Sequence, residues 1–232
     1  KAGRDKQPED ITVAIPYIKA ILEAFRIPVI EVPGYEADDV IGTLSRRAEA
    51  EGFTTYMMTP DKDYGQLVTG RVYMYRPAIK GQGFEVRGPQ QVCERYGISS
   101  PRQVIDLLAL EGDASDNVPG CPGVGEKTAA KLIAEYGSVE NLLDNVDSLK
   151  GALHRKISEN MEQIRLSKHL VTIVTDAPVD FDPESLRRKE PDTEALVKIF
   201  RELEFKSLIS KYAGTGAPAP EAPALVPHAP AA

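Results

Sequence analysis

The sequence predicts an α/β fold in which a mostly parallel sheet flanked by helices is followed by a helical region. Between residues 27 and 75, short apolar or β-branched runs alternate with a helical segment, which is typical of strand–helix–strand units. From residue 89, apolar residues recur at helical spacing instead. From residue 213 the chain is rich in Ala and Pro, which is typical of a linker or tail. Three regions are therefore expected, at 1–88, 89–212 and 213–232.

The first region begins with a helix over residues 8–25, in which Pro16 is expected to produce a kink. A buried strand follows at 27–32, and a helix over 36–50 ends at Gly52. Further strands are predicted at 53–59 and 71–75, the second leading into a Gly-rich hairpin at "IKGQGFEV". The later helices are expected at 89–96, 101–111, 125–136, 138–144, 150–168 and 192–204, with a short strand at "LVTIVT" between the last two.

Composition excludes several functional classes. The chain of 232 residues is 42% hydrophobic, enough for a core, and its net charge of −7 gives no global basic footprint for nucleic acid. The two cysteines lack metal-type spacing and are typical of reduced thiols in a cytoplasmic protein. Three scattered histidines argue against a zinc site or a Ser–His triad. No run is long enough for a membrane span, and no signal peptide opens the chain.

Acidic residues cluster after two of the predicted strands. "YEADDV" and "PDKDYG" each follow a strand, and each has an ordinary explanation, as a helix start or a solvated turn. In a parallel sheet, however, both positions lie at the rim where ligands bind, so their carboxylates would converge and repel. An oxygen-only site suits Mg²⁺ or Mn²⁺, and two such ions suit hydrolysis of a phosphodiester. The acids are Glu36, Asp38, Asp39, Asp61 and Asp63.

A third acidic pair, Asp113 and Asp116, lies in "EGDASDNVPG". Asp and Asn favour turns, so this segment is explained either as a loop between helices or as a further part of the acidic site.

The stretch "GCPGVGEKTAAK" places three glycines before a helix that carries Lys127 and Lys131. A P-loop is excluded because Glu126 separates Gly125 from Lys127 and the segment follows a helix. The alternatives are an ordinary Gly-rich turn and a helix–hairpin–helix whose backbone amides bind DNA phosphates independently of sequence. In the second case the binding residues are Gly120, Gly123, Val124, Gly125, Lys127, Thr128 and Lys131.

Several motifs in order resemble one family. "KAGR", "YEADDVIGTL", "DKDYGQLV" and "GDASDNVPGCPGVGEKTA" are similar to the 5′-nuclease domain of bacterial DNA polymerase I, within the flap endonuclease superfamily, from Lys1 to about Tyr212. The resemblance implies a PIN-like, resolvase-like sheet and a helix–three-turn–helix. It also implies hydrolysis of DNA at 5′ flaps, nicks and RNA-primed ends in replication and repair, in the bacterial nucleoid, with polymerase domains in the same full-length chain and no membrane.

The resemblance also implies roles for single residues. Two Mg²⁺ ions, or Mn²⁺, would be held by the five clustered acids together with Asp113 and Asp116. Lys1 and Arg4 would contact the scissile phosphate as catalytic residues, and the hairpin would hold duplex DNA and a K⁺ ion.

Two departures from the family accompany the resemblance. The family has two strands, each bearing an Asp, ahead of "KAGR", so the chain is expected to be an N-terminally incomplete part of the domain. Tyr64-Gly65 also replaces larger apolar residues. Two other hypotheses remain: a fragment that binds duplex DNA without effective cleavage, and a PIN-like RNA nuclease. The long helical region argues against the second.

Overall fold

The structure is a computed structural model that describes residues 7–78 and 83–213. Its described residues form two compact units, one of residues 31–181 and the other of residues 7–30 with 182–213. Each unit has a hydrophobic core of its own.

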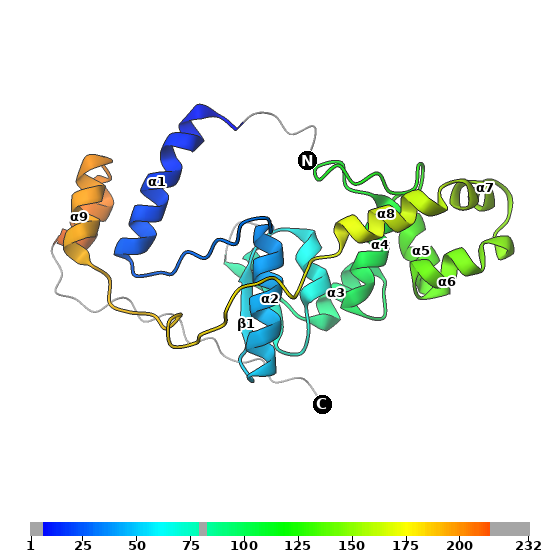
Figure 1. Cartoon of the computed structure of the whole chain (residues 1–232), viewed down its shortest axis with the longest axis horizontal. Coiled ribbons are helices and arrows are strands. Elements are labelled where there is room, and N and C mark those ends of the chain that lie inside the picture. The colour runs from blue at the N-terminus through cyan, green and yellow to red at the C-terminus, as the bar shows by residue number, and fades with distance from the viewer. Residues whose placement is uncertain (1–6, 79–82, 214–232) are drawn as a thin grey trace. The chain divides into compact units, whose positions relative to one another are not determined.

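The helices and strands of the first unit occur in a fixed order (Figure 1). They are α2 (Ala37–Ala50), β1 (Thr55–Met58), the 3-10 helix η1 (Lys62–Leu67), β2 (Val72–Pro77), β3 (Phe84–Arg87), α3 (Pro89–Tyr96), η2 (Pro101–Gln103), α4 (Val104–Glu111), α5 (Glu126–Tyr136), α6 (Val139–Asp144), η3 (Val146–Ser148), α7 (Gly151–Glu159) and α8 (Met161–Val171).

The described sheet has the order β1-β2-β3, and α2 lies beside β1 (Figure 1). Strands β1 and β2 are parallel, in register from Thr55 opposite Val72 to Met58 opposite Tyr75. Strands β2 and β3 are antiparallel, which confirms the predicted hairpin. Met57, Val72 and Met74 are buried, because one face of this pair packs into the core. The α/β fold with a following helical region is therefore confirmed.

Helix α4 is the centre of the helical region. Its residues Val104, Leu107, Leu108 and Leu110 are nearly inaccessible, and α4 packs against both α5 and α8. Such an all-round apolar helix is stable only inside a core, so α4 fixes the positions of the helices and loops around it.

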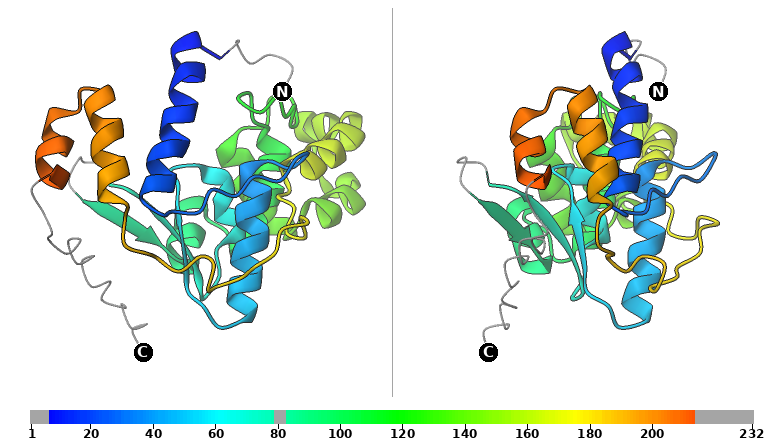
Figure 2. Two further views of the ribbon diagram at one scale, coloured as in Figure 1. Left: turned by 60° about the vertical axis from the view of Figure 1, so that its left-hand side comes forward. Right: turned by 90° about the vertical axis from the view of Figure 1, so that its left-hand side faces the viewer.

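The second unit contains α1 (Glu9–Ala24), α9 (Thr193–Glu202) and α10 (Lys206–Ala213). Figure 2 shows α9 beside α1, and the two are joined by a hydrogen bond from Asp192 N to Ala24 O of 2.7 Å. Leu196 and Phe200 of α9 are buried against Ala24. Pro16 lies inside the single helix α1, and α10 was not predicted.

The strand predicted at 27–32 is wrong. These residues have no regular secondary structure, and Ile27, Val29 and Ile30 are exposed. No described strand pairs with this segment, so its β-branched sequence alone does not produce a strand.

The strand predicted at "LVTIVT" is also wrong. Helix α8 extends to Val171, and the residues after it are held by side chains instead of a neighbouring strand. Gln66 donates to Val171 O (2.9 Å) and accepts from Ile173 N (3.0 Å), and Asp39 Oδ1 accepts from Val174 N (2.8 Å). Buried backbone groups need partners, and these side chains supply them without a strand.

The helix predicted over 150–168 is two helices, α7 and α8, which meet at Asn160. The Asn160 backbone is not helical, with φ −119°, and its side-chain amide donates to Lys156 O at the end of α7 (2.8 Å). Asn is a good residue for such a break because its amide replaces a backbone donor.

Candidate functional site

Three carboxylates meet at one place in the first unit. Asp63 lies in η1, just after β1, and Asp113 and Asp116 lie in the loop after α4. One oxygen from each lies within 4.8 Å of the others. The loop is closed by paired backbone hydrogen bonds between Asp113 and Val118, of 2.9 and 2.7 Å. The third acidic pair predicted from the sequence therefore lies beside the "DKD" motif.

Asp63 has an incomplete environment within this group. Its Oδ1 is buried and has no hydrogen-bond partner in the part of the chain that the structure describes. Burial, followed by the charges of Asp61, Asp113 and Asp116, raises the pKa of Asp63 to about 7, and Lys62 only partly opposes this. A buried oxygen without a donor is costly, and a divalent cation is the partner that three converging carboxylates favour.

Asp113 is kept charged by its neighbours. Lys62 Nζ lies 3.1 Å from Asp113 Oδ2, while the Ser115 backbone N–H (2.9 Å) and hydroxyl donate to Oδ1. Burial would raise the pKa of Asp113, but these hydrogen bonds and the charge of Lys62 outweigh it and lower that pKa. The group therefore joins a carboxylate that stays ionised to one, Asp63, that holds its proton more tightly.

The structure does not bring the remaining predicted acids into this group. Asp39 accepts hydrogen bonds from Glu36 N (3.1 Å) and Val174 N, Asp38 accepts from Asp39 N (3.1 Å), and Asp61 accepts from Asp63 N (3.0 Å). The expectation that all five acids converge is thus corrected, because most of these carboxylates bond to nearby backbone N–H groups. Glu36 and Asp39 form a capping box at the start of α2.

The two acidic motifs nevertheless lie near one shared side chain, Tyr64. Burial and then the charges of Asp38, Asp61 and Asp39 raise the pKa of Tyr64 to about 12. Burial and the charge of Asp39 also raise the pKa of Asp38. The field of both motifs is therefore negative around Tyr64, as expected for neighbouring acids at one rim. Lys1 and Arg4, predicted as catalytic residues, lie outside the described residues.

The glycine hairpin is held by a close approach of two backbone segments. Gly112 and Gly120 both have positive φ, +78° and +61°, and a Cβ on Gly120 would lie 2.4 Å from Gly112 N. The hydrogen bond from Cys121 N to Leu110 O (2.8 Å) joins the same segments. The base of the acidic loop is therefore also the base of the hairpin, so one contact positions both.

The predicted DNA-binding residues differ in exposure. Gly123, Gly125, Lys127 and Lys131 are exposed, whereas the Val124 side chain is buried in the core. Val124 therefore offers only its backbone to a ligand. Thr128 is half-buried on the first turn of α5, and α4 and α5 flank the hairpin as predicted.

Sequence reasoning missed three residues that hold the hairpin. Lys156 donates to Gly123 O (3.0 Å), Gln163 donates to Gly120 O (2.8 Å), and Ser167 accepts from Gly120 N (3.0 Å). They come from α7 and α8, more than 30 residues away in the chain. No local pattern marks them, since they look like ordinary helix residues.

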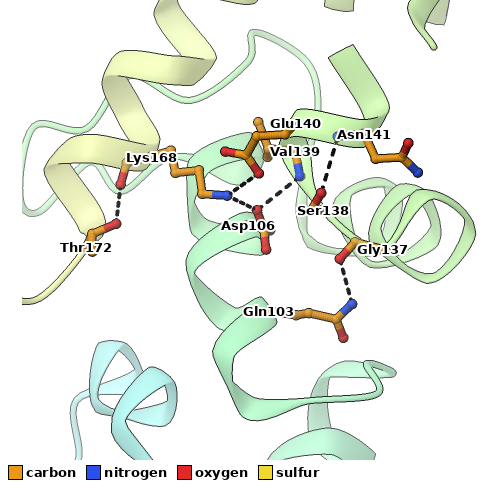
Figure 3. A network of polar contacts seen from close by, with 9 residues as sticks. All are labelled: Gln103, Asp106, Gly137, Ser138, Val139, Glu140, Asn141, Lys168 and Thr172. Atoms are coloured by element: carbon orange, nitrogen blue, oxygen red, sulfur yellow. Dashed lines mark hydrogen bonds and ion pairs between the residues drawn. The ribbon is translucent and has the colours of Figure 1, made fainter. Parts of the chain in front are cut away.

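A polar network joins α4, α6 and α8 beneath the hairpin helices (Figure 3). Asp106 is buried and accepts from Val139 N (3.0 Å) and from Lys168 Nζ (2.6 Å), and Lys168 also bonds to Glu140 (2.6 Å). These hydrogen bonds raise the pKa of Lys168 although burial opposes its charge. Asp106 thus holds the start of α6 on α4.

We expect Asp106→Ala to lower the free energy of unfolding by about 2 kcal/mol, because it leaves the buried Val139 N–H without a partner. Glu140→Ala is the matched control. It removes the other carboxylate of Lys168, which is 65% exposed, and should cost less than about 1 kcal/mol. Urea denaturation followed by circular dichroism measures both. Equal losses would contradict the importance of the buried hydrogen bond.

Comparison with known proteins identifies the family. Residues 1–97 match the family described as the 5′-3′ exonuclease N-terminal resolvase-like domain. Residues 99–194 match the one described as the 5′-3′ exonuclease C-terminal SAM fold. The chain belongs to the 5′-3′ exonuclease family. This confirms the resemblance on which the sequence analysis depended, and its implied resolvase-like fold.

The curated relatives are bacterial polymerases. The chain is 44% identical over 226 residues to the thermostable DNA polymerase I of Thermus filiformis, covering 96% of this chain and 26% of that protein. It is 41% identical over 215 residues to DNA polymerase I of Bacillus subtilis strain 168, covering 91% of this chain and 24% of that protein. The chain therefore spans about a quarter of the length of these relatives.

Solved structures share the fold at low identity. A complex of the bacteriophage T5 flap endonuclease with DNA and metal ions is 19% identical with a TM-score of 0.63, covering 90% of this chain and 74% of that one. The catalytic core of Rad2 with DNA substrate is 17% identical with a TM-score of 0.59, covering 89% and 71%. None of the described helices is long and apolar enough to span a membrane.

Proposed function

We propose that the chain is a divalent-metal-dependent 5′ nuclease that hydrolyses DNA phosphodiesters at 5′ flaps, nicks and RNA-primed ends. The group of Asp63, Asp113 and Asp116, with its unpartnered buried oxygen, is the observation that carries this proposal. The polymerase relatives support a place in the same chain as polymerase domains, acting on chromosomal DNA in the bacterial cytoplasm. The T5 flap endonuclease and Rad2 structures are complexes with DNA, which supports DNA as the substrate class.

We assign the catalytic region to residues 1–88 and the DNA-holding helices to 89–212, with 213–232 as a linker. Asp63, Asp113 and Asp116 would hold one Mg²⁺ or Mn²⁺, and we assign Glu36, Asp38, Asp39 and Asp61 to a second. When bound, such ions activate water and stabilise the leaving oxygen of a phosphodiester. Lys62 keeps Asp113 ionised, and Lys1 and Arg4 would offset charge on the phosphate.

The hairpin would hold the duplex. The exposed N-terminus of α5 directs free backbone N–H groups outward, and the exposed Lys127 and Lys131 add positive charge there. A K⁺ ion bound by hairpin carbonyls would share Gly123 O with the ammonium of Lys156, which already donates to that oxygen.

A labelled 5′-flap DNA tests the proposed function. We expect cleavage by this chain with Mg²⁺ and none with EDTA, with a 5′-phosphate on the product. Asp147→Asn is a control because the Asp147 carboxylate is 99% exposed and lies outside the acidic group. Cleavage that persists in EDTA, or that acts equally on single-stranded RNA, would contradict the proposal and favour a metal-independent or an RNA nuclease.

A second candidate function is a module that binds duplex DNA without effective cleavage. The exposed lysines at the hairpin favour it, because binding needs the hairpin whereas cutting needs the acids. DNA binding in EDTA, with no cleavage in Mg²⁺, would support this alternative.

Both candidates predict the same salt dependence at the hairpin. We expect Lys131→Met to weaken duplex binding for all sequences and to reduce the slope of log affinity against log salt by about 1, because one phosphate contact is lost. Lys198→Met is the control, since Lys198 is an exposed lysine on α9 in the other unit. Fluorescence anisotropy over a salt series measures both slopes. Equal slopes for wild type and Lys131→Met would exclude Lys131 from the DNA contact.

A further inference from the structure

A cavity of about 220 Å³ lies in the first unit, between the β2–β3 hairpin, α3, α4 and the start of α5. Buried leucines of α4 form part of its wall. The charged residues that line it are Lys62, Arg76, Arg87, Arg95, Glu111 and Glu126. Four cations around one cavity repel one another and are only partly offset by two carboxylates, so the cavity favours an anion.

Arg76 differs from the other cations in lacking a partner. Its Nε is buried and makes no hydrogen bond among the described residues. By contrast, Arg87 forms two hydrogen bonds with Glu85 (2.9 and 3.1 Å), and Lys62 pairs with Asp113 (3.1 Å). A buried guanidinium donor without an acceptor is expensive. An anion in the cavity would supply the missing acceptor.

The cations converge on the half-buried ring of Tyr96, which also lines the cavity. Burial raises the pKa of Tyr96, and the charges of Arg95, Lys62 and Arg87 act against this rise. The Arg95 guanidinium lies 5.0 Å from the Tyr96 ring centroid. Several positive charges thus surround one aromatic wall of the cavity.

One cation of the cavity is free to change partners. Arg95 bonds to Glu126 (2.7 Å), but the two side chains are 48% and 47% exposed. An ion pair this exposed contributes little stability, so Arg95 can turn to a ligand at small cost. Arg76 would then be the fixed donor and Arg95 the adaptable one.

We propose that this cavity binds a phosphate group, with Arg76 as its main donor and Lys62 and Arg95 in support. A guanidinium donates two parallel hydrogen bonds to phosphate oxygens, which suits a tetrahedral dianion or a diester. The apolar wall of α4 suits the sugar of an attached nucleotide. The cavity shares Lys62 with the acidic group through Asp113, yet its phosphate binding requires neither a metal nor cleavage.

Titration of inorganic phosphate into the protein in EDTA, followed by calorimetry in a chloride buffer, tests the proposal. We expect Arg76→Gln to weaken phosphate binding by at least about tenfold, because the charged bidentate donor is lost. Arg102→Gln is the matched control: Arg102 is an exposed arginine of the neighbouring η2 that does not line the cavity. Unchanged affinity in Arg76→Gln, or an equal loss in Arg102→Gln, would overturn the proposal.

A second variant covers the case in which Arg76→Gln fails to fold. Arg95→Gln removes a half-exposed side chain, should fold, and should weaken phosphate binding by about threefold or more. No change in that variant would then overturn the proposal. Competition with oligonucleotides identifies the source of the phosphate. Displacement only by a 5′-phosphorylated strand indicates a terminal phosphate, and displacement by both phosphorylated and unphosphorylated strands indicates the backbone. Both results support the site.

Discussion

Replacing Gly120 by Ala is expected to lower the free energy of unfolding by more than about 4 kcal/mol, because steric overlap and backbone strain act together. The new Cβ would lie 2.4 Å from Gly112 N and 2.6 Å from Glu111 C, both backbone atoms. The φ of +61° at Gly120 adds strain for any residue with a side chain. Neither segment can move aside freely, since Gly112 N bonds to Leu108 O (2.8 Å) at the end of α4.

Gly125→Ala is the matched control. Gly125 has φ −104°, and a Cβ there meets no atom within 4 Å. The change should cost less than about 1 kcal/mol, mainly by replacing Gly at the N-cap of α5. Urea denaturation followed by circular dichroism compares the two variants. Similar stabilities would show that the contact between residues 112 and 120 is not tight in solution.

The Gly120 contact also joins the two parts of the proposed function. The loop of Asp113 and Asp116 and the hairpin share one base, so a shift there displaces both. We therefore expect a folded remnant of Gly120→Ala to lose affinity for Mg²⁺ and for DNA together. An effect on DNA alone would mean that Gly120 acts only as a phosphate contact.

Local sequence patterns were sufficient to predict most elements of the fold. The alternation around β1 and β2 and the helical spacing of α3 to α6 are local, and the structure confirms them. The errors at 27–32 and 170–175 arose because strand formation depends on a neighbour that local sequence does not reveal. At 170–175 the neighbours are the side chains of Gln66 and Asp39, about 100 or more residues away.

The candidate site was predictable in its chemistry but not in its grouping. Strand-end acids indicated a metal rim, yet only Asp63, Asp113 and Asp116 meet within 4.8 Å among the residues that the structure describes. Asp39 instead bonds to Val174 N, a contact that depends on tertiary folding. Lys156 and Arg76 gave no signal in the sequence, because their meaning comes from Gly123 O and from the cavity wall.

Asp63→Asn is expected to reduce Mg²⁺-dependent cleavage of flap DNA by at least about 100-fold, equivalent to about 3 kcal/mol of transition-state stabilisation. The same substitution should stabilise the protein in EDTA at pH 8, where the wild type holds an ionised Asp63 beside other acids. Loss of function combined with a gain in stability is typical of a ligand site, whereas a structural residue would lose both.

The pH dependence in EDTA provides an independent check. Asp63 has a pKa of about 7 when folded, above its ordinary value of 3.8, so the folded state binds more protons between these values. Stability from this group is therefore fully present below about pH 4 and is lost as pH rises through 7. Discounted for partial exposure, the loss is about 1–2 kcal/mol.

Mg²⁺ should reverse this loss in the wild type but not in Asp63→Asn. At pH 8 a bound cation replaces the proton as the partner of the Asp63 carboxylate, so thermal stability rises with Mg²⁺ concentration. In Asp63→Asn, both the fall in stability with pH and the response to Mg²⁺ should be much smaller, with only a minor remainder from Asp38, whose pKa is also raised by burial and Asp39. If Asp63→Asn and wild type gain equal stability from Mg²⁺, the cation binds elsewhere and the raised pKa of Asp63 has no connection with metal binding.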